Sequence, residues 1–159
     1  LSGINPNKKN IEDGLSTIEE KAIGSSIKSG SSKIEGVLEY GEVPKKSGLW
    51  LMDAPSYTPE SLTGFSSAGS QICLFSTGSG NCYSSDLMPT IRITANPETA
   101  LRLSHQIDHD CSDLIINGNF EKAEDKLLED LISVLNGKLC YGEILGDGSE
   151  TISRFGEAL

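Results

Sequence analysis

The heptapeptide FSTGSGN, at residues 75–81, places small hydroxyl residues and two glycines directly after an apolar run. Small residues let a backbone approach a ligand closely, and Ser and Thr add hydroxyl donors to the N–H groups of such a loop. The chemistry that this composition favours is the binding of an anion. The alternative is a tight turn whose hydroxyls only cap backbone groups. Spacing alone leaves both interpretations open, because loops at strand ends host sites but commonly just connect elements.

The same loop does not fit the nucleotide-binding patterns. Gly78-Ser79-Gly80 begins like the dinucleotide fingerprint GxGxxG, but Tyr83 stands where the third small residue is required. That fingerprint also needs a helix directly after the loop, whereas Pro89 and another apolar segment follow here. The chain has no GxxxxGK[ST] motif. The sequence therefore does not support a nicotinamide, flavin or nucleoside triphosphate site.

Carboxylates and histidines offer two further candidates for chemistry. Asp53 ends an apolar segment and could act as a base, a metal ligand or a helix cap, of which capping is the commoner fate. The segment HQIDHD, at residues 105–110, spaces His105 and His109 four apart, which would put them on one helix face. With two aspartates they could bind a metal ion. No Cys or Glu completes a familiar ligand spacing, so a solvated polar face near a helix end is the favoured interpretation.

Apolar periodicity predicts strands that alternate with helices after a polar, extended arm at residues 1–15. Ser16 and Glu19 form a predicted capping box, Thr58 is a predicted N-cap before Pro59, and Asn96 is another before Pro97. We expect residues 16–159 to form a single domain. The predicted strands are 36–40, 49–54, 71–77 and 90–95, and the predicted helices are 17–28, one from Thr58, one from Asn96 through Leu103, 110–118 and 121–137.

This order predicts a three-layer α/β fold with a short, mostly parallel sheet of about four strands flanked by helices. Ligands of such sheets bind beyond the carboxyl ends of the strands. If the second, third and fourth strands are parallel, Asp53, Ser76–Asn81 and Asn96 gather on one edge. The helix N-termini at Thr58 and Asn96 would open there, each with about half a positive charge. The architecture thus predicts an anion site without a basic patch.

The composition of the chain, above all its net charge, argues against certain classes of binding partner. The 159 residues carry 23 acidic and 13 basic side chains, for a net charge of −10. Such a charge argues against nucleic acid or an anionic membrane as partner. No apolar run approaches the roughly 20 residues of a membrane span. Four cysteines without a CxxC pair fit a reducing cytoplasm. Because Leu1 rather than Met comes first, we expect a piece of a longer chain.

Several segments together carry a family resemblance. In chain order they are GLSTIEEKAIG, GLWLMDAP, TGFSSAG, FSTGSGN followed by PTIRITAN, and DHDCS. Each is weak alone, but the ordered set, from about Gly3 to Phe155, resembles the C-terminal part of the altronate and galactarate dehydratase family of sugar-acid hydro-lyases. That family also includes sulfolactate sulfo-lyase.

The resemblance implies a Rossmann-type α/β domain at the end of a longer dehydratase chain. The implied activity is loss of water from a polyhydroxy acid to give a 2-keto-3-deoxy acid, with a divalent metal such as iron(II) bound mainly outside this domain. The implied partners are a small anionic sugar acid, the N-terminal domains of the same enzyme and further copies in a homo-oligomer. The isolated 159 residues are expected to fold but to be inactive. Two alternatives stay open: a sulfo-lyase, and a non-catalytic sugar-acid-binding or assembly domain.

The resemblance also marks positions of a site. Our hypothesis is that Thr77 and the amides of Gly78 and Gly80 donate to the substrate, while Asp53 acts as a metal- or hydroxyl-directed catalytic carboxylate. The family commonly has Arg where Ser79 stands, and such an Arg would be a natural carboxylate clamp. Its loss implies an altered substrate, a weakened activity or a clamp from another domain. It also commonly has Asn at the position of Asp110, and Ala-Gly at 111–112. The candidate substrate-binding residues are Thr63, Gly64, Ser76, Thr77, Gly78, Gly80, Asn81 and Asn96, and Asp108 and Asp110 also match the family.

Overall fold

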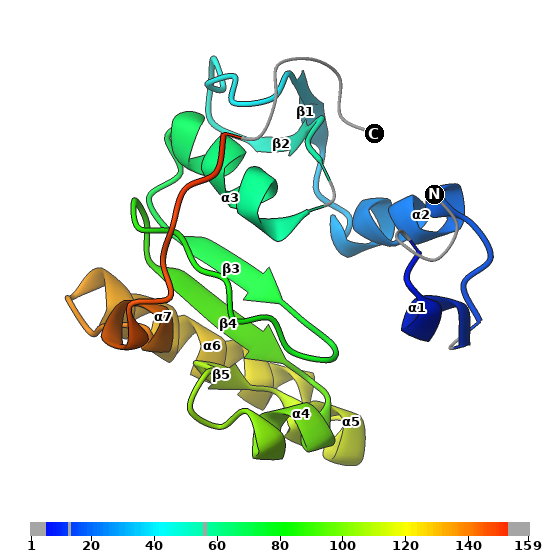
Figure 1. Cartoon of the computed structure of the whole chain (residues 1–159), viewed down its shortest axis with the longest axis vertical. Helices are drawn as coiled ribbons and strands as arrows, with labels where there is room; N and C mark the ends of the chain where they lie inside the picture. The colour runs from blue at the N-terminus through cyan, green and yellow to red at the C-terminus, as the bar shows by residue number, and fades with distance from the viewer. Residues whose placement is uncertain (1–5, 13, 56, 153–159) are drawn as a thin grey trace. The chain divides into compact units, whose positions relative to one another are not determined.

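The computed structural model describes residues 6–12, 14–55 and 57–152. The chain divides into two compact units, one of residues 1–37 with 46–51 and the other of residues 38–45 with 52–159. The boundary passes through β1 and β2. Figure 1 labels the helices and strands of both units.

The first unit begins with two helices, α1 (Lys8–Glu12) and α2 (Ile18–Lys28). α1 lies within the segment expected to be extended. α2 confirms the predicted helix, but its N-cap is Thr17 rather than the predicted Ser16. The Thr17 hydroxyl accepts a hydrogen bond from the Glu20 N–H at 3.1 Å, and the Glu20 carboxylate accepts one from the Ser16 N–H at 2.8 Å. The pattern S/T-x-x-E fits Thr17–Glu20 as well as Ser16–Glu19, so the sequence alone does not choose the register.

β1 (Ile34–Leu38) and β2 (Leu49–Met52) form a two-stranded sheet of their own. The Trp50 ring lies against Gly36, where a Cβ would come within 2.9 Å of ring atom Cζ3. The prediction that the second strand joins the main sheet is therefore wrong. All four β2 residues are half-buried rather than buried on both faces, as a strand at the centre of a covered sheet would be.

The main sheet belongs to the second unit and has the order β3–β4–β5, with both pairs parallel. Its strands are β3 (Cys73–Ser76), β4 (Thr90–Thr94) and β5 (His109–Asp110). The α/β class and the parallel sheet are confirmed, but the sheet is smaller than the expected four strands. β5 stands at the start of a segment predicted to be helical. A strand of two residues is too short for its period to be visible in the sequence.

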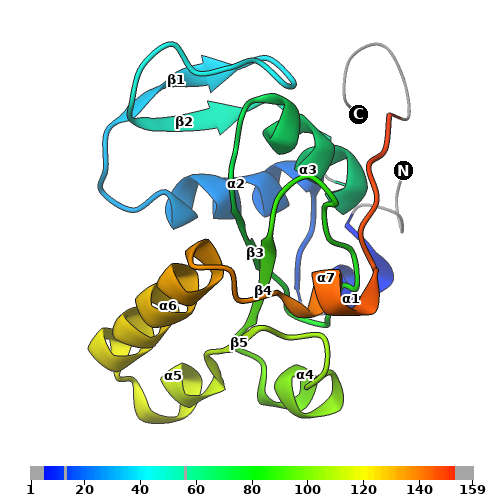
Figure 2. The same ribbon diagram turned by 90° about the vertical axis from the view of Figure 1, so that its left-hand side faces the viewer.

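Helices cover both faces of this sheet. Figure 2 shows α6 on one face and α7 on the other. Ile91, Val134 and Cys140 form the buried core between β4, α6 and the start of α7, with Ile72, Ile93 and Leu131 packed against it. The helices of the second unit are α3 (Thr58–Ser67), α4 (Pro97–Arg102), α5 (Ser112–Asn117), α6 (Phe120–Leu135) and α7 (Tyr141–Leu145).

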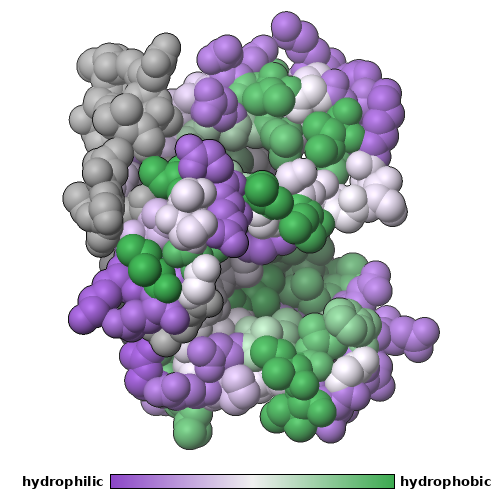
Figure 3. All heavy atoms as spheres, turned by 90° about the vertical axis from the view of Figure 1, so that its right-hand side faces the viewer, coloured by the Kyte–Doolittle hydropathy of each residue, from purple (hydrophilic) through white to green (hydrophobic). Residues whose placement is uncertain are grey.

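The apolar face predicted for α6 is only partly buried. Leu131 packs against the core, whereas Leu128, Ile132 and Leu135 are 52%, 49% and 62% exposed. A sheet of three short strands is too narrow to cover the whole stripe. Figure 3 shows one face of the molecule, on which several separate apolar groups are divided by polar side chains. Such patches are typical contact surfaces for other domains or copies.

Two further observations concern the helices. α3 has Tyr57 at its N-cap position without a side-chain cap, so Thr58 is the first helical residue and not the predicted cap. Asn96 caps α4 as predicted, because its side chain accepts from the N–H groups of Glu98 and Thr99. Within the described ranges, no helix combines the length and the apolar character needed to cross a membrane.

Candidate functional site

The three parallel strands of the main sheet bring their following segments to one edge. Ser76 pairs with Ile93, and Ile93 pairs in turn with His109. The Thr77 N–H donates to Ile93 O at 2.9 Å and continues the ladder for one residue beyond β3. The loop after β3, residues 77–81, therefore starts at the edge where ligands of parallel sheets bind.

Side chains of β4 and α4 hold this loop by its carbonyl groups. Three consecutive bonds do so: Thr94 Oγ1 to Thr77 O at 2.8 Å, Thr99 Oγ1 to Gly78 O at 2.7 Å, and Arg102 Nη2 to Ser79 O at 2.7 Å. The N–H groups of Gly78 and Ser79, by contrast, have no acceptor among the described residues. Both residues are exposed. The loop thus turns its acceptors inward and leaves two donors open.

Gly80 closes the loop. Its N–H donates to Thr77 Oγ1 at 3.1 Å, so this amide is used within the loop and not left for a ligand, as our hypothesis had assigned it. Gly80 has φ +97°, and a Cβ there would stand 2.1 Å from Leu103 Cδ1. Because its oxygen accepts the Gly80 bond, the Thr77 hydroxyl keeps its hydrogen for another acceptor, and none is present in the described part of the chain.

Asn81 and Asn96 hold neighbouring elements in place. Asn81 Oδ1 accepts from the Tyr83 N–H at 3.0 Å, and its Nδ2 donates to Thr58 Oγ1 at 3.1 Å. This second bond ties the loop to the first turn of α3. Asn96 Oδ1 accepts from the first turn of α4, at 3.0 Å from the Glu98 N–H. Both amides position the edge of the sheet, and neither role depends on a ligand.

Thr63 and Gly64 are held by other parts of the second unit. The Thr63 hydroxyl lies 2.8 Å from Glu150 Oε2 and accepts from the Thr151 N–H at 2.9 Å. Gly64 lies against Tyr40, where a Cβ would come within 2.4 Å of ring atom Cε2. These contacts pack α3 against residues 150–151 and Tyr40, and they account for both residues without a ligand.

Asp53 follows β2 and is exposed. Its N–H donates to Leu38 O at 2.9 Å. Its carboxylate has no hydrogen bond or ion pair within the described ranges. Because β2 belongs to the two-stranded sheet, strand pairing does not bring Asp53 to the edge with residues 77–81, and that expectation is wrong. A catalytic role for Asp53 remains a hypothesis.

The segment HQIDHD does not form a helix face, and only part of it, including His105 and Asp110, is exposed to solvent. His105 is exposed, whereas His109 lies on β5 with a fully buried side chain. Asp108 accepts from the backbone N–H groups of Arg92 and Tyr141, at 2.9 Å and 2.7 Å. No group of three or more His, Cys, Asp or Glu side chains in the described residues could hold a metal ion. The favoured interpretation is thus wrong for Asp108 and His109.

Sequence reasoning also missed Arg92, which is completely buried on the middle strand. Its Nη1 donates to Cys82 O at 2.6 Å and lies 3.5 Å from Asp147 Oδ2, while its Nε lies 3.7 Å from Asp108 Oδ2. The only signal was a charged residue inside the strand TIRIT. Arg92 fixes the segment after the loop to β4 and to the end of α7.

A second polar pair, of the buried His109 and the half-buried Asp130, joins β5 to α6. His109 Nδ1 lies 2.8 Å from Asp130 Oδ2, and the other carboxylate oxygen lies 3.0 Å from Lys138 Nζ. Burial raises the pKa of Asp130, but the hydrogen bonds from His109 and Lys138 outweigh it, so the net pKa is lowered. The same bond to Asp130 raises the pKa of Lys138. His109 Nε2 is buried and has no hydrogen-bond partner among the described residues.

Comparisons with known proteins agree with the resemblance. The family model for D-galactarate/altronate dehydratase, C-terminal, matches residues 1–157. The chain is 39% identical to the (2R)-sulfolactate sulfo-lyase subunit beta of Chromohalobacter salexigens over 99% of its length and 41% of the relative's.

Two dehydratases of Escherichia coli are also similar. Altronate dehydratase is 35% identical over 87% of this chain and 28% of its own length. Galactarate dehydratase (L-threo-forming) is 31% identical over 84% of this chain and 26% of its own length. The chain therefore spans about two-fifths or less of the relatives it matches. On the match of the family model to nearly every residue, this chain belongs to the D-galactarate/altronate dehydratase C-terminal family.

Proposed function

We propose that this chain is part of a hydro-lyase that removes water from a polyhydroxy acid of the altronate or galactarate type, giving a 2-keto-3-deoxy acid. The observation that supports it is the loop after β3, whose carbonyls are tied back while the N–H groups of Gly78 and Ser79 and the Thr77 hydroxyl stay open. Such donors suit a carboxylate without a cationic side chain. They offer a substitute for the Arg that the family commonly has at position 79.

In the dehydration reaction, these donors would stabilise negative charge on the substrate. The proton on the carbon beside a carboxylate is barely acidic, and its removal places charge on the carboxylate oxygens as an enediolate. Fixed N–H and O–H donors stabilise that charge where it develops. The C–H electron pair then forms the C=C bond and expels the neighbouring hydroxyl, which leaves as water after taking a proton. The enol tautomerises to the 2-keto acid. Asp53 remains our candidate carboxylate, directed at a hydroxyl or a metal.

The described residues supply no set of ligands for the iron(II) that the resemblance implies. A divalent cation would act as a Lewis acid toward the leaving hydroxyl or the enediolate. We place its ligands outside this chain, in the remaining part of the enzyme. The exposed apolar side chains of α2 and α6, such as Ile27 and Leu135, support contacts with further domains or with a second copy.

The second candidate is sulfo-lyase activity. It is favoured by the 39% identity to a sulfo-lyase beta subunit over nearly the whole chain. The first half of the reaction would be the same, because the proton beside the carboxylate is again removed. The bond that breaks next would be C–S instead of C–O, and sulfite would leave.

One assay separates these functions. The intact protein, loaded anaerobically with iron(II), is offered altronate, galactarate and sulfolactate in parallel, and 2-keto acid and sulfite are measured. We expect keto acid from a sugar acid without sulfite. Sulfite from sulfolactate alone would replace our proposal with the sulfo-lyase. Binding of a sugar acid without turnover would favour a non-catalytic domain.

Two substitutions test the loop itself. A Cβ at Gly78 meets no atom within 4 Å, so Gly78→Ala keeps the fold while it blocks the close approach of a carboxylate. We expect kcat/KM to fall by at least about tenfold. Gly24→Ala is the matched control, because its Cβ also meets open space and it lies in α2. Thr77→Val removes the hydroxyl donor. Unchanged kcat/KM in both Gly78→Ala and Thr77→Val would rule out substrate binding by this loop.

A further inference from the structure

A cationic side chain of α4 is bonded to the loop after β3. Arg102 is exposed at the end of this helix, and its Nη2 donates to Ser79 O at 2.7 Å. The next residue, Leu103, packs against the same loop, since a Cβ at Gly80 would meet its Cδ1 at 2.1 Å. No carboxylate of the described residues forms an ion pair with Arg102. The guanidinium therefore brings an unneutralised positive charge to the loop.

The peptide group between Ser79 and Gly80 connects Arg102 with Thr77. Its oxygen accepts from the guanidinium, and its N–H donates to Thr77 Oγ1 at 3.1 Å. In a trans peptide the C=O and N–H bonds point in opposite directions. The guanidinium and the Thr77 hydroxyl therefore lie on opposite sides of this peptide. Arg102 stands behind the loop, and it is not placed to clamp an acid that is bound to the Thr77 hydroxyl.

Hydrogen bonds in such a series polarise one another. A cation at a carbonyl oxygen draws electron density toward that oxygen, which makes the N–H group of the same peptide a stronger donor. The Gly80 N–H in turn draws density from Thr77 Oγ1 and makes the hydroxyl hydrogen a stronger donor. That hydrogen has no acceptor in the described part of the chain. The series thus begins at a charge and ends at a donor that is open to a ligand.

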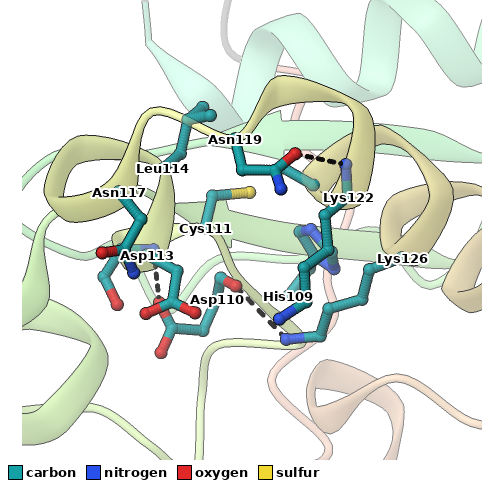
Figure 4. Close-up of a pocket in the computed structure, with 11 residues that line it drawn as sticks. His109, Asp110, Cys111, Asp113, Leu114, Asn117, Asn119, Lys122 and Lys126 are labelled. Atoms are coloured by element: carbon teal, nitrogen blue, oxygen red, sulfur yellow. Dashed lines mark hydrogen bonds between the residues drawn. The ribbon is translucent and has the colours of Figure 1, made fainter.

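Other cationic side chains near this edge of the sheet are placed differently. A pocket of about 630 Å³ lies where β5 ends, and its lining includes no residue of the loop at 77–81. Figure 4 shows Lys122 and Lys126 on one side of this pocket. Lys126 Nζ donates to the backbone oxygen of Asp110 at 3.4 Å. These two lysines line a separate space, whereas Arg102 is bonded to the loop itself.

We propose that Arg102 is a positioning residue whose charge strengthens the Thr77 hydroxyl through the Ser79–Gly80 peptide. This inference rests on the proposed function, because the hydroxyl must face the substrate carboxylate, and it fails if the protein turns over no acid. Negative charge grows on the carboxylate oxygens as the neighbouring carbon loses its proton. A strengthened donor therefore stabilises the transition state more than the bound substrate. The effect of Arg102 falls mainly on kcat.

A double-mutant cycle on the intact protein tests this connection with the acid that the protein turns over. Arg102→Met lowers kcat by roughly threefold to tenfold and leaves KM nearly unchanged. Thr77→Val removes the hydroxyl that receives the effect, so Arg102→Met added to Thr77→Val lowers kcat no further. Thr77→Ser keeps the hydroxyl, and in that background Arg102→Met again lowers kcat. Arg102→Lys keeps a cation of similar reach and recovers most of the lost kcat.

The control is Lys45→Met, which removes an exposed positive charge elsewhere and changes neither kcat nor KM. An Arg102→Met loss that is equally large with and without the Thr77 hydroxyl would overturn the inference, because Arg102 would then act only by holding the loop. A rise in KM with unchanged kcat would also overturn it, since Arg102 would then bind the acid in the ground state.

Two outcomes separate this inference from the proposed function. Full activity of Arg102→Met beside an impaired Thr77→Val would overturn the inference and leave the function of the loop in place. Full activity of Thr77→Val would overturn the inference as well, whereas substrate binding by the loop is ruled out only if Gly78→Ala is also fully active.

Discussion

The ends of β3 and β5 meet the same edge of the sheet but offer ligands different chemistry. After β3, backbone groups are the donors, and side chains of β4 and α4 act through the three carbonyls that they tie back. After β5, ionisable side chains line the space, and a buried histidine is held by a carboxylate of α6. The first region depends on loop geometry. The second depends on charge and on the contact between His109 and Asp130.

This difference has a consequence for variants. A small change of backbone conformation should disturb the loop more than the pocket, whereas a change of pH should do the reverse. The two regions share β4, since Ser76 pairs with Ile93 and Ile93 pairs with His109. A variant that disturbs both ends equally would therefore indicate damage to the sheet rather than to either region.

Gly80→Ala should give the largest effect. The residue has φ +97°, and a Cβ would meet Leu103 Cδ1 at 2.1 Å. We expect the loop to open, the stability to fall by roughly 1–3 kcal/mol, and kcat/KM of the intact protein to fall by about 100-fold as the donors move. Steady-state kinetics and urea unfolding measure both effects. Gly30→Ala also places an alanine at a positive φ, +67° in open space, and should leave kcat/KM unchanged. If Gly80→Ala were as active as Gly30→Ala, loop geometry would not control the site.

Asp130→Asn should disturb the end of β5 and spare the loop. The folded-state pKa of Asp130 is lowered below the ordinary 3.8, so its ionised form stabilises the folded protein. This stabilisation is complete well above pH 3.8 and is lost as the pH falls through the lower, folded-state pKa. We expect the variant to lose roughly 1–3 kcal/mol at pH 7 and progressively less in acid.

Urea unfolding from pH 7 downward measures this pH dependence. Asp125→Asn is the control, since it removes the same charge from an exposed position of α6. A stability difference between wild type and Asp130→Asn that did not shrink in acid would show that the carboxylate contributes through packing and not through its charge.

The sequence predicted the parts of this edge whose signals are local. Asn96 precedes a proline at a helix start, and the loop at 77–81 follows an apolar strand, so both could be found without knowledge of the fold. The α6 segment has a period long enough to be recognised. The sequence could not show which N–H groups of the loop are already hydrogen-bonded within it. The bond from the Gly80 N–H to the Thr77 hydroxyl depends on the backbone conformation of the loop.

The buried polar pairs could not be predicted for a different reason. His109 and Asp130 are 21 residues apart, and Arg92 and Asp108 are 16 apart. Each pair joins segments that are distant in the sequence, so no short spacing reveals it. The prediction that β2 joins the main sheet was wrong for the same reason. The composition of a strand does not show with which distant segment the strand pairs. Charged residues inside a strand pattern, such as Arg92 in TIRIT, were the one available hint.

Thr99→Val should give the smallest of the three effects, because it removes a single hydrogen bond to the loop after β3. Thr99 is buried, and its hydroxyl donates to Gly78 O at 2.7 Å. Valine keeps the shape of the side chain and removes only this bond, so we expect a stability loss of about 1 kcal/mol. If the bond also orients the Gly78 N–H, kcat/KM should fall by roughly threefold to tenfold.

Thr99→Ser restores the hydroxyl and should recover kcat/KM even where the lost methyl group lowers stability. A serine variant as slow as the valine variant would mean that Thr99 acts through packing alone, and the carbonyl ties would then not be what holds the loop open.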